Sequence, residues 1–566
     1  MVNERAGKLA EERDLIDVDC VVDAYYNIVP DLGILSQKVE FGTSGHRGSS
    51  LNAAFNEAHI VAISQAIYEY RKLHNIDGKL YIGFDTHVLS IPAYKSAIEV
   101  LVPAGVDVFV DSRDSWTPTP AVSLAIIEAN RDKNGNILPD ALLKTGWNGK
   151  GLSDGIVITP SHNPPADGGF KYNPPNGGPA DSETTAWIQN RANEIIKQGY
   201  KNVKRVPFEQ AILADNVHRH DFRKQYVDEL RTIIDLDAVK NSGAKFAVDP
   251  LGGASVEYWP LIAETYGIDL TVLNDKVNPR FAFMTIDWDG KVRMDCSSPY
   301  CMASVVNKIK GSSDFTLAVG NDTDADRHGI VTPDAGLMNP NHYLTSCIKY
   351  LFGSARPAWG KDFLVGKTIV SSRMIEKVAA KLGRTLFETP VGFKWFVDGL
   401  MQSKLGFSGE ESAGGTFLRR DARLWTTDKD GILLDLLAFE IVAVTGETPS
   451  NIYAECEQEF GKSYFERIDS PATLEQKAAM KKIVPEDVTV TELAGEKIER
   501  IQTKTPANNG EIGGLYVGTK NAWFAARPSG TENVCKFYAE SFISEAHLRE
   551  LQAEAQGLVD KVTGKY

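Results

Sequence analysis

The chain of 566 residues contains few cysteines, and its six are scattered. No two of them form a CxxC pair, so the sequence shows no sign of a disulfide framework or of a cysteine-rich zinc site. No apolar run approaches the roughly 20 residues that a membrane helix needs. The first residues also lack the apolar segment of a signal peptide. We therefore expect a cytoplasmic protein that does not act at a membrane.

The chain also lacks an excess of positive charge, because 61 basic residues stand against 75 acidic ones and the net charge is −14. A field of this sign repels nucleic acid and anionic membranes, so no nucleic-acid partner is expected. It also repels phosphate esters, so a phosphate-handling enzyme of this charge must gather Arg and Lys locally. The 43% hydrophobic and 24% charged residues are ordinary for a globular protein. The length predicts three or four domains.

Apolar runs of strand length alternate with longer amphipathic stretches from about residue 57 onward. This alternation predicts α/β layers with mostly parallel sheets. Expected strands are 80–84, 106–110, 155–159, 245–248, 270–273, 315–319 and 362–370. Expected helices are 57–74, 92–102, 119–128, 371–382 and 430–444. After residue 448 the pattern changes to a short antiparallel meander at 513–519, 521–526 and 534–541, followed by a closing helix at 545–562. The tail is therefore predicted to be a smaller α+β domain.

A proline-rich turn follows the expected strand at 155–159. It holds Ser161, His162 and an asparagine on what we predict to be an exposed turn, and Lys171 follows shortly after. A rigidly held serine near an imidazole and an ammonium suits a phosphoryl acceptor. An ordinary Ser-Pro-Asn turn explains the same residues about equally well. No GxSxG elbow is present, which argues against an esterase serine.

Three carboxylates stand at alternate positions after the expected strand at 315–319, namely Asp322, Asp324 and Asp326, with Arg327 next. In an extended loop, alternate side chains point to one side. Three hard oxygen ligands suit Mg²⁺. The EF-hand pattern fails, because the sixth and twelfth positions are Arg327 and Pro333 rather than Gly and Glu. A plain solvated turn is the less favoured alternative.

Four further loops carry groups that suit a sugar phosphate. The loop at 42–48 offers small residues and Arg47, and the segment 392–395 holds Lys394 between aromatic residues. Carboxylate and hydroxyl groups at 409–415, which accept hydrogen bonds from sugar hydroxyls, include Glu410 and Ser412. The loop at 527–533 combines an Arg fork with short donors, which favours a phosphate clamp over a simple hairpin turn. Each loop alone is also compatible with a structural turn or, for Lys394, with an ammonium lying over an aromatic core.

Together these motifs resemble the α-D-phosphohexomutase superfamily, in the family's order: TSGHRG, TPSHNP, DTDADR, GEESAG and RPSGT. The stretches VDPLGG, VGFKWFVDGL and WFAARPSGTE are similar to those of the bacterial phosphoglucomutase group in particular. The resemblance covers nearly the whole chain. It implies four domains around a central cleft, of which the first three are α/β mixed sheets sandwiched by helices and the last is a smaller α+β domain. We expect their boundaries at 1–210, 211–331, 332–450 and 451–566.

The resemblance also implies roles for single residues. Ser161 would be the phosphoserine and, with Asp322, Asp324 and Asp326, would bind Mg²⁺. The transferring phosphoryl group would be surrounded by Arg47, His162, Lys171 and Arg327. Lys394 would orient the sugar phosphate and Glu410 and Ser412 would hold its hydroxyls. The non-reacting phosphate would be gripped by Arg527, Ser529, Gly530 and Thr531. The loop 130–155 looks longer than the bacterial pattern, so the resemblance leaves the geometry of the rim near the serine open.

The implied activity is the interconversion of glucose 1-phosphate and glucose 6-phosphate through a phosphoserine and a glucose 1,6-bisphosphate intermediate. Four separated loops fit this chemistry, because phosphoryl transfer depends on charge neutralisation and positioning. The open alternatives are a phosphomannomutase or other phosphohexomutase, a catalytically silent sugar-phosphate-binding protein, and a metal-dependent phosphatase. The expected assembly is a monomer or homodimer.

Overall fold

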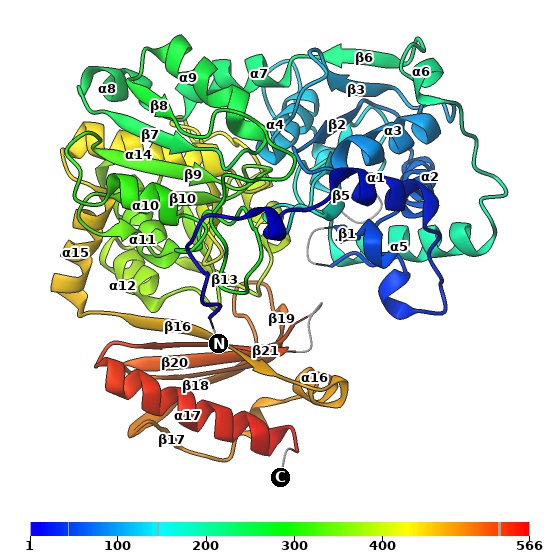
Figure 1. Ribbon diagram of the computed structural model, residues 1–566. Helices are drawn as coiled ribbons and strands as arrows, with labels where there is room; N and C mark the ends of the chain where they lie inside the picture. Colours follow the sequence, from blue (N-terminus) through cyan, green and yellow to red (C-terminus); the bar gives the residue numbers. More distant parts are fainter. Residues whose placement is uncertain (1, 43–44, 144–146, 530–533, 565–566) are drawn as a thin grey trace. The chain divides into compact units, whose positions relative to one another are not determined.

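A computed structural model describes residues 2–42, 45–143, 147–529 and 534–564 (Figure 1). The contacts divide the chain into two compact units. Unit 1 comprises Met1–Asn339, Val397–Ser403 and Ser412–Thr448, and unit 2 comprises Pro340–Phe396, Lys404–Glu411 and Pro449–Tyr566. The chain therefore passes from one unit to the other several times within the stretch from 339 to 449.

The first sheet of unit 1 has the strand order β1-β5-β4-β2-β3-β6. Its central strands β4, β2, β3 and β6 are parallel, whereas β5 runs antiparallel to both β4 and β1. The strands are β1 (His46–Ser49), β2 (Leu80–Phe84), β3 (Val108–Asp111), β4 (Asp154–Ile158), β5 (Asp167–Asn173) and β6 (Val217–His220). The buried faces of β2 and β4 fit a sheet that is covered by helices on both sides.

The helices of this region are α1 (Val18–Asn27), α2 (Glu57–Leu73), α3 (Ser90–Leu101), α4 (Thr119–Ala129), α5 (Ser182–Lys197) and α6 (Phe208–Ala211). Helix α2 packs against α3 and α5, and α4 packs against β2 and β4. Helix α4 is buried almost all around, which matches its mostly apolar sequence.

The second sheet of unit 1 has the order β11-β10-β9-β7-β8. Strands β7 (Phe246–Asp249), β8 (Leu270–Val272) and β9 (Leu317–Asn321) are parallel, and β10 (His328–Thr332) and β11 (Gly336–Leu337) are antiparallel additions. The three carboxylates predicted to bind a metal ion, Asp322, Asp324 and Asp326, lie in the tight connection between β9 and β10. The helices here are α7 (Phe222–Glu229), α8 (Leu236–Asn241), α9 (Tyr258–Tyr266) and α10 (Ala303–Ile309).

Helix α14 (Gly431–Thr445) packs on β9, β10 and α8. Its sequence is mostly apolar, with Asp435 and Glu440 buried among the apolar residues, as suits a helix enclosed by other elements. Its N-cap, Asp430, accepts a hydrogen bond from the backbone N–H of Leu433 and further ones from Tyr226 and Trp425. This cap fixes the start of α14 beside the β9–β10 connection. Unit 1 also contains α13 (Val397–Met401) and β15 (Gly414–Phe417).

Unit 2 contains a parallel set of strands in which β12 (Leu364–Thr368) pairs with β13 (Leu386–Thr389) and β14 (Leu405–Glu410). Three helices pack on one another beside it, α11 (Pro340–Tyr350), α12 (Arg373–Lys381) and α15 (Pro449–Phe460). Helix α11 continues into a π-helical turn, Leu351–Ala355.

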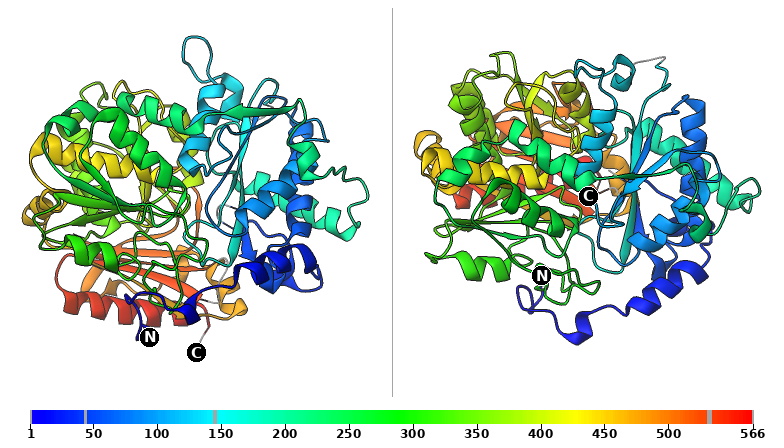
Figure 2. Two further views of the ribbon diagram at one scale, coloured as in Figure 1. Left: turned by 45° about the horizontal axis from the view of Figure 1, so that its top comes forward. Right: turned by 90° about the horizontal axis from the view of Figure 1, so that it is seen from above.

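The C-terminal part of unit 2 is a sheet of order β16-β21-β20-β19-β18-β17, and its pairs are antiparallel. The strands are β16 (Tyr464–Pro471), β17 (Glu492–Leu493), β18 (Glu496–Lys504), β19 (Glu511–Thr519), β20 (Ala522–Pro528) and β21 (Val534–Ser541). Helix α17 (Glu545–Val562) lies along this sheet against β20 and β21 (Figures 1 and 2), and α16 (Leu474–Met480) lies near β19 and β20. The meander and the closing helix predicted from the sequence are confirmed.

A buried carboxylate joins the two parts of unit 2. Glu540 on β21 is fully buried and accepts hydrogen bonds from the hydroxyls of Ser372 and Ser463. It also accepts 2.8 Å and 2.6 Å bonds from the backbone N–H of Arg373 and the indole of Trp523. Glu540 therefore caps α12 from the neighbouring sheet, and both of its oxygens are shared by two donors.

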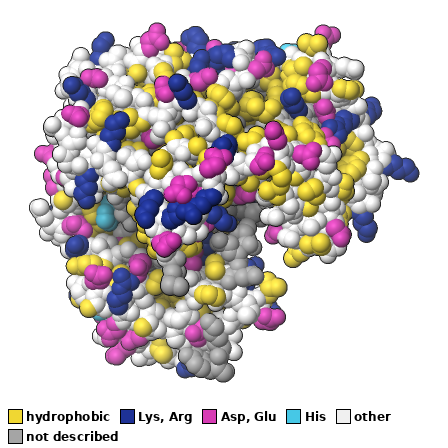
Figure 3. Space-filling view, viewed as in Figure 1, with side chains coloured by type: hydrophobic (Ala, Val, Ile, Leu, Met, Phe, Trp, Pro, Cys, Tyr) yellow, Lys and Arg dark blue, Asp and Glu magenta, His cyan; other side chains and the backbone are white. Residues whose placement is uncertain are grey.

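Short 3-10 turns complete the chain, at Glu12–Asp14, Leu35–Gln37, Ser50–Asn52, Pro139–Leu142, Leu230–Thr232, Ala254–Glu257, Phe393–Trp395 and Pro485–Asp487. The α/β class with a smaller last domain is confirmed, with mixed rather than purely parallel sheets. Among the helices of the described residues, none is long and apolar enough to span a bilayer. On the face shown in Figure 3, acidic and basic side chains are interspersed.

Candidate active site and metal loop

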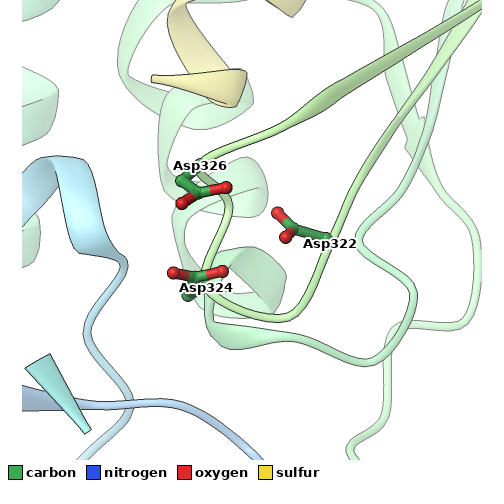
Figure 4. A group of neighbouring side chains, drawn as sticks. All are labelled: Asp322, Asp324 and Asp326. Atoms are coloured by element: carbon green, nitrogen blue, oxygen red, sulfur yellow. The ribbon is translucent and has the colours of Figure 1, made fainter. Parts of the chain in front are cut away.

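The three carboxylates of the β9–β10 connection converge as the sequence predicts (Figure 4). One ligand oxygen from each of Asp322, Asp324 and Asp326 lies within 4.8 Å of the others, and all three side chains are buried. The predicted extended loop is wrong. The segment is a turn closed by a 3.0 Å bond from Ala325 N–H to Asp322 O, and Ala325 has a left-handed φ of 54°. The turn, rather than strand alternation, brings the carboxylates to one side.

The donor set fits a divalent cation. Asp324 Oδ1 and Asp326 Oδ1 are buried and have no hydrogen-bond partner among the described residues. Burial, followed by the charges of Asp324 and Asp326, raises the pKa of Asp322 well above its usual range. Unpartnered buried carboxylate oxygens that repel one another are what a bound cation would satisfy. Hard oxygen donors of this kind suit Mg²⁺.

Ser161 lies against this loop, but it is not on an exposed turn as the sequence suggested. Only 1% of the residue is exposed, and its φ of 60° is left-handed. Its Oγ donates a 2.6 Å hydrogen bond to Asp322 Oδ2 and lies 3.2 Å from His162 Nδ1. Its carbonyl accepts a 2.5 Å bond from Thr323 Oγ1. The serine hydroxyl is thus fixed beside the metal loop in a strained backbone conformation, which is typical of functional sites.

A buried polar layer supports the serine turn from below. Ser161 N–H donates to Thr159 Oγ1 at 2.8 Å, and that hydroxyl donates to Asp85 Oδ2 at 2.7 Å. Asp85 also accepts bonds from Ser90 and from His87, whose Nε2 lies 3.0 Å from Asn163 O. No sequence motif indicated a role for Asp85. The network holds both ends of the turn in place.

The predicted cations surround the same point from separate elements of unit 1. Lys171 on β5 reaches Asp324 Oδ2 at 2.6 Å and Asp326 Oδ2 at 3.4 Å. Arg327 lies 4.0 Å from Asp322 and 3.9 Å from Asp326. Burial would lower the pKa of Arg327, but the surrounding carboxylates raise it above its usual value, so it stays charged. Burial, followed by Arg327, lowers the pKa of His162 well below its usual range, so this imidazole is neutral.

Arg47 belongs to the same group through sheet pairing. It lies on β1 opposite Gly169 of β5, two residues before Lys171. Burial lowers its pKa, whereas Asp324 and Asp326 act to raise it. These opposing effects place Arg47 within the field of the metal loop. Thr43 and Ser44 of the same predicted loop lie outside the described residues.

Gly169 is expected to be required beneath the serine turn. A Cβ at this position would lie 2.0 Å from Thr159 O and 2.6 Å from Pro160 N, both backbone atoms of the turn. Gly169→Ala should therefore push the turn away and cost about 1–3 kcal/mol in stability. We expect a lower kcat with a smaller change in KM, measured by steady-state kinetics beside thermal unfolding. Gly105→Ala is not a suitable control, because its φ of 86° adds strain of its own. Gly353→Ala is suitable, because it would meet nothing within 4 Å.

The remaining predicted residues are placed by element. Lys394 lies in a 3-10 turn of unit 2, and its Nζ is 5.7 Å from the Trp395 ring centroid. Glu410 ends β14, is 5% exposed and accepts a 2.9 Å bond from Gly392 N–H. Ser412 belongs to unit 1 and is half-buried.

The predicted phosphate clamp starts at the end of β20. Arg527 is half-buried on this strand, and the following Ser529 is buried and bonds through its backbone N–H to Val534 O at 2.9 Å. Gly530 and Thr531 lie outside the described residues. The roles of these side chains therefore stay predictions.

Three residues of the metal loop's surroundings were missed. Lys429 Nζ lies 2.8 Å from Asp326 Oδ2, and Thr119 Oγ1 donates to Asp324 Oδ2 at 2.6 Å. Asp295 lies 3.9 Å from Arg327. A signal was present for Lys429, since it stands between Asp428 and the helix cap Asp430. Thr119 and Asp295 come from distant segments without a motif, so only the tertiary fold reveals them.

Family models match the chain in four consecutive regions. They are described as phosphoglucomutase/phosphomannomutase alpha/beta/alpha domain I at residues 38–199, domain II at 224–336, domain III at 339–460 and the C-terminal domain at 484–557. The models therefore account for most of the chain in one family order.

Individual proteins agree with the models. The chain is 53% identical over 561 residues to a phosphoglucomutase of Komagataeibacter xylinus, covering 99% of this chain and 98% of that protein. It is 27% identical to human phosphoglucomutase-1 over 56% of this chain and 57% of the human one. Among solved structures, a putative phosphomannomutase from Thermus thermophilus matches with a TM-score of 0.69 and 23% identity, covering 92% of this chain and 99% of that one. The pp63/parafusin phosphoglucomutase of Paramecium matches with a TM-score of 0.70 at 21% identity, over 95% and 96% of the two chains. At these identities the structural matches show the fold alone.

Proposed function

The chain belongs to the phosphoglucomutase/phosphomannomutase family, and on that premise we propose that it interconverts glucose 1-phosphate and glucose 6-phosphate. The observation that carries the proposal is the serine hydroxyl of Ser161, buried and held 2.6 Å from a carboxylate of the metal loop. A solvent-exposed turn would not hold a hydroxyl in one orientation. The relative with 53% identity over nearly the whole chain supports glucose as the sugar.

The reaction we propose has two phosphoryl transfers. Phosphorylated Ser161 first gives its phosphoryl group to the free hydroxyl of the sugar phosphate. The bond between Oγ and phosphorus breaks, the sugar oxygen bonds to phosphorus to form glucose 1,6-bisphosphate, and the proton of the sugar hydroxyl ends on the released Oγ. The bisphosphate then turns over, Ser161 Oγ takes the other phosphoryl group, and the proton that Oγ loses ends on the sugar oxygen released from phosphorus. In that second step the hydroxyl proton already has an acceptor in place, because Oγ donates to Asp322 Oδ2. Neutral His162 lies 3.2 Å from the same oxygen.

The cations of unit 1 neutralise the charge on the phosphoryl group in both steps. Arg47, Lys171 and Arg327 would face its oxygens, and such charge stabilisation carries most of the catalysis in phosphoryl transfer. Asp322, Asp324 and Asp326, together with a phosphoserine oxygen, would hold Mg²⁺, which supplies further positive charge at the transferring oxygens. The proposal requires no nucleophile besides Ser161.

We propose that the substrate is oriented by residues outside this cluster. Lys394 would contact the sugar phosphate. Glu410 would accept hydrogen bonds from the sugar hydroxyls, and Ser412 would exchange hydrogen bonds with them. Arg527, Ser529, Gly530 and Thr531 would bind the phosphate that is not reacting. The 2.9 Å bond from Gly392 N–H supports the role of Glu410, because it fixes the carboxylate in one orientation at the end of β14.

Two measurements test the function. Purified protein is treated with glucose 1,6-bisphosphate, and intact mass should increase by one phosphoryl group located at Ser161. Coupled assays then compare glucose 1-phosphate with mannose 1-phosphate. A clear preference for mannose would replace the proposal with a phosphomannomutase. Labelling without turnover of either sugar would identify a silent binding protein, and release of inorganic phosphate alone would identify a phosphatase.

Arg527→Ala is expected to weaken the handling of sugar phosphate about ten- to a few hundredfold, because a charged fork to phosphate contributes about 1.5–3 kcal/mol. Lysine should restore the activity only in part, because a point charge cannot make the bidentate contact. Both directions of the reaction should suffer equally, since the distal phosphate is held in both poses. Steady-state kinetics in both directions measure the effect, with Lys520→Ala in the exposed turn before β20 as the control. Unchanged kinetics would show that the loop is only a turn.

The cytoplasm is the compartment we propose. No disulfide joins the six cysteines, all of which lie in the described part of the chain, and five of them are buried, which suits a reducing environment. For the assembly, a monomer or homodimer remains the prediction, and size-exclusion chromatography with light scattering decides between them.

A further inference from the structure

The carboxylates of Asp324 and Asp326 use their two oxygens in different ways. In each, Oδ2 is occupied by side-chain donors. Asp324 Oδ2 accepts from Thr119 at 2.6 Å and from Lys171 at 2.6 Å. Asp326 Oδ2 binds Lys429 at 2.8 Å and Lys171 at 3.4 Å. In each, Oδ1 is buried and has no hydrogen-bond partner among the described residues, although Arg327 Nε lies 3.9 Å from Asp326 Oδ1.

We propose that Lys429, acting with Lys171, restricts Asp326 to one available oxygen and thereby makes the metal loop select Mg²⁺ over Ca²⁺. The inference deepens the proposed function, on which it rests, by assigning metal specificity to a residue outside the loop itself. Lys429 is a positioning residue in this role, because it acts through Asp326 and not on the sugar or the phosphorus.

The physical basis is the different coordination of the two ions. Ca²⁺ takes about six to eight oxygens at about 2.3–2.6 Å and readily accepts both oxygens of a carboxylate. Mg²⁺ demands about six ligands at about 2.0–2.1 Å in near-octahedral geometry, to which a carboxylate contributes one oxygen. A lysine bound to Oδ2 blocks the two-oxygen mode and leaves the one-oxygen mode intact. The same arrangement on Asp324, with Thr119 as the second donor, extends the restriction to two ligands.

Lys429 is held in place well enough to exert such a restriction. Its side chain is 13% exposed, and its stem covers Gly414, where an added Cβ would lie 2.2 Å from Lys429 Cδ. The residues on either side are anchored as well. Asp428 accepts a 3.0 Å bond from Asn173, and Gly431 N–H donates a 2.9 Å bond to Ala325 O in the metal loop. The ammonium therefore approaches Asp326 from a segment that is itself tied to the loop.

The test is the binding of Mg²⁺ and Ca²⁺ to the protein without sugar phosphate, measured by calorimetry for wild type and Lys429→Met. Removing a cation should tighten both ions, since less positive charge then opposes them. The proposal requires that the affinity for Ca²⁺ increases more than the affinity for Mg²⁺. The ratio of the Ca²⁺ Kd to the Mg²⁺ Kd should therefore fall by on the order of tenfold. Lys224→Met, on an exposed lysine of α7, should leave both Kd values unchanged.

An equal fall in the Kd of both ions would overturn the proposal, because the effect of Lys429 would then come from its charge alone. Unchanged affinities would overturn it as well and leave Lys429 a structural residue. If Lys429→Met does not fold, Lys429→Leu takes its place, since it also removes the donor from Asp326 Oδ2 while keeping an apolar side chain over Gly414. It should shift the ratio in the same direction, and an unchanged ratio contradicts the inference. These measurements need no turnover, so a failure of the mutase assay in wild type rejects the proposed function and not the metal selectivity.

Discussion

Ser161→Ala should lose at least about a thousandfold in the conversion of glucose 1-phosphate to glucose 6-phosphate, because it removes the atom that carries the phosphoryl group. Alanine keeps the Cβ, so the left-handed strain at this position stays and the fold should change little. The coupled assay measures the loss, and circular dichroism with thermal unfolding checks the fold. Treatment with glucose 1,6-bisphosphate should no longer add a phosphoryl group.

Two variants sharpen this result. Ser112→Ala, at an exposed position, should be fully active. Ser161→Gly should be as inactive as the alanine variant, yet it removes the left-handed strain and should be more stable than that variant by about 1 kcal/mol. Near-normal turnover of Ser161→Ala would remove the phosphoserine assignment and leave Ser44 or His162 as carriers.

Exhaustive treatment with EDTA should reduce turnover at least about a hundredfold, and Mg²⁺ should restore it. Without a cation, the Oδ1 atoms of Asp324 and Asp326 have no hydrogen-bond partner among the described residues, and the negative loop repels the incoming phosphate. Ca²⁺ should restore turnover less well, because its coordination is larger and less strict. The assay is run on dialysed protein with each ion added back in turn.

A matched variant separates the metal from general salt effects. Asp326→Asn keeps the size of the side chain but removes its charge, and it should need more Mg²⁺ for half-maximal rate. Asp334→Asn, in the turn after β10, should keep the wild-type requirement. Full activity in the presence of excess chelator would contradict the metal dependence.

The elements that the sequence predicted lie close to their observed bounds, because their apolar periods are strong, although many further strands and helices were not predicted. The strand Leu80–Phe84 and the closing helix Glu545–Val562 match their predicted bounds. Strand β5 was missed, because its two glycines weaken the strand pattern. A side chain would not fit at either glycine, since Gly168 lies against the Phe55 ring and Gly169 lies against the backbone of the serine turn. Such contacts join distant segments and leave no local period in the sequence.

The candidate site was predicted in its residue types and less well in its geometry. Motif order identified Ser161 and the three aspartates. It did not reveal that Ser161 is buried, because burial here depends on Thr323 and Asp322 from another sheet. Nor did it reveal the turn at Ala325, since alanine rarely adopts a left-handed φ. Domain boundaries and the roles of Lys394, Glu410 and Arg527 stay predictions.

Glu540 limits how the chain can be shortened. Its carboxylate closes the start of α12, whose capping residues Ser372 and Arg373 lie 168 and 167 positions earlier in the sequence. A fragment that ends after α15 would leave those donors without this acceptor and would expose the side of α12 that the sheet covers. The C-terminal sheet therefore belongs to the same folding unit as α12. A stable shorter protein would need a new acidic cap in front of α12.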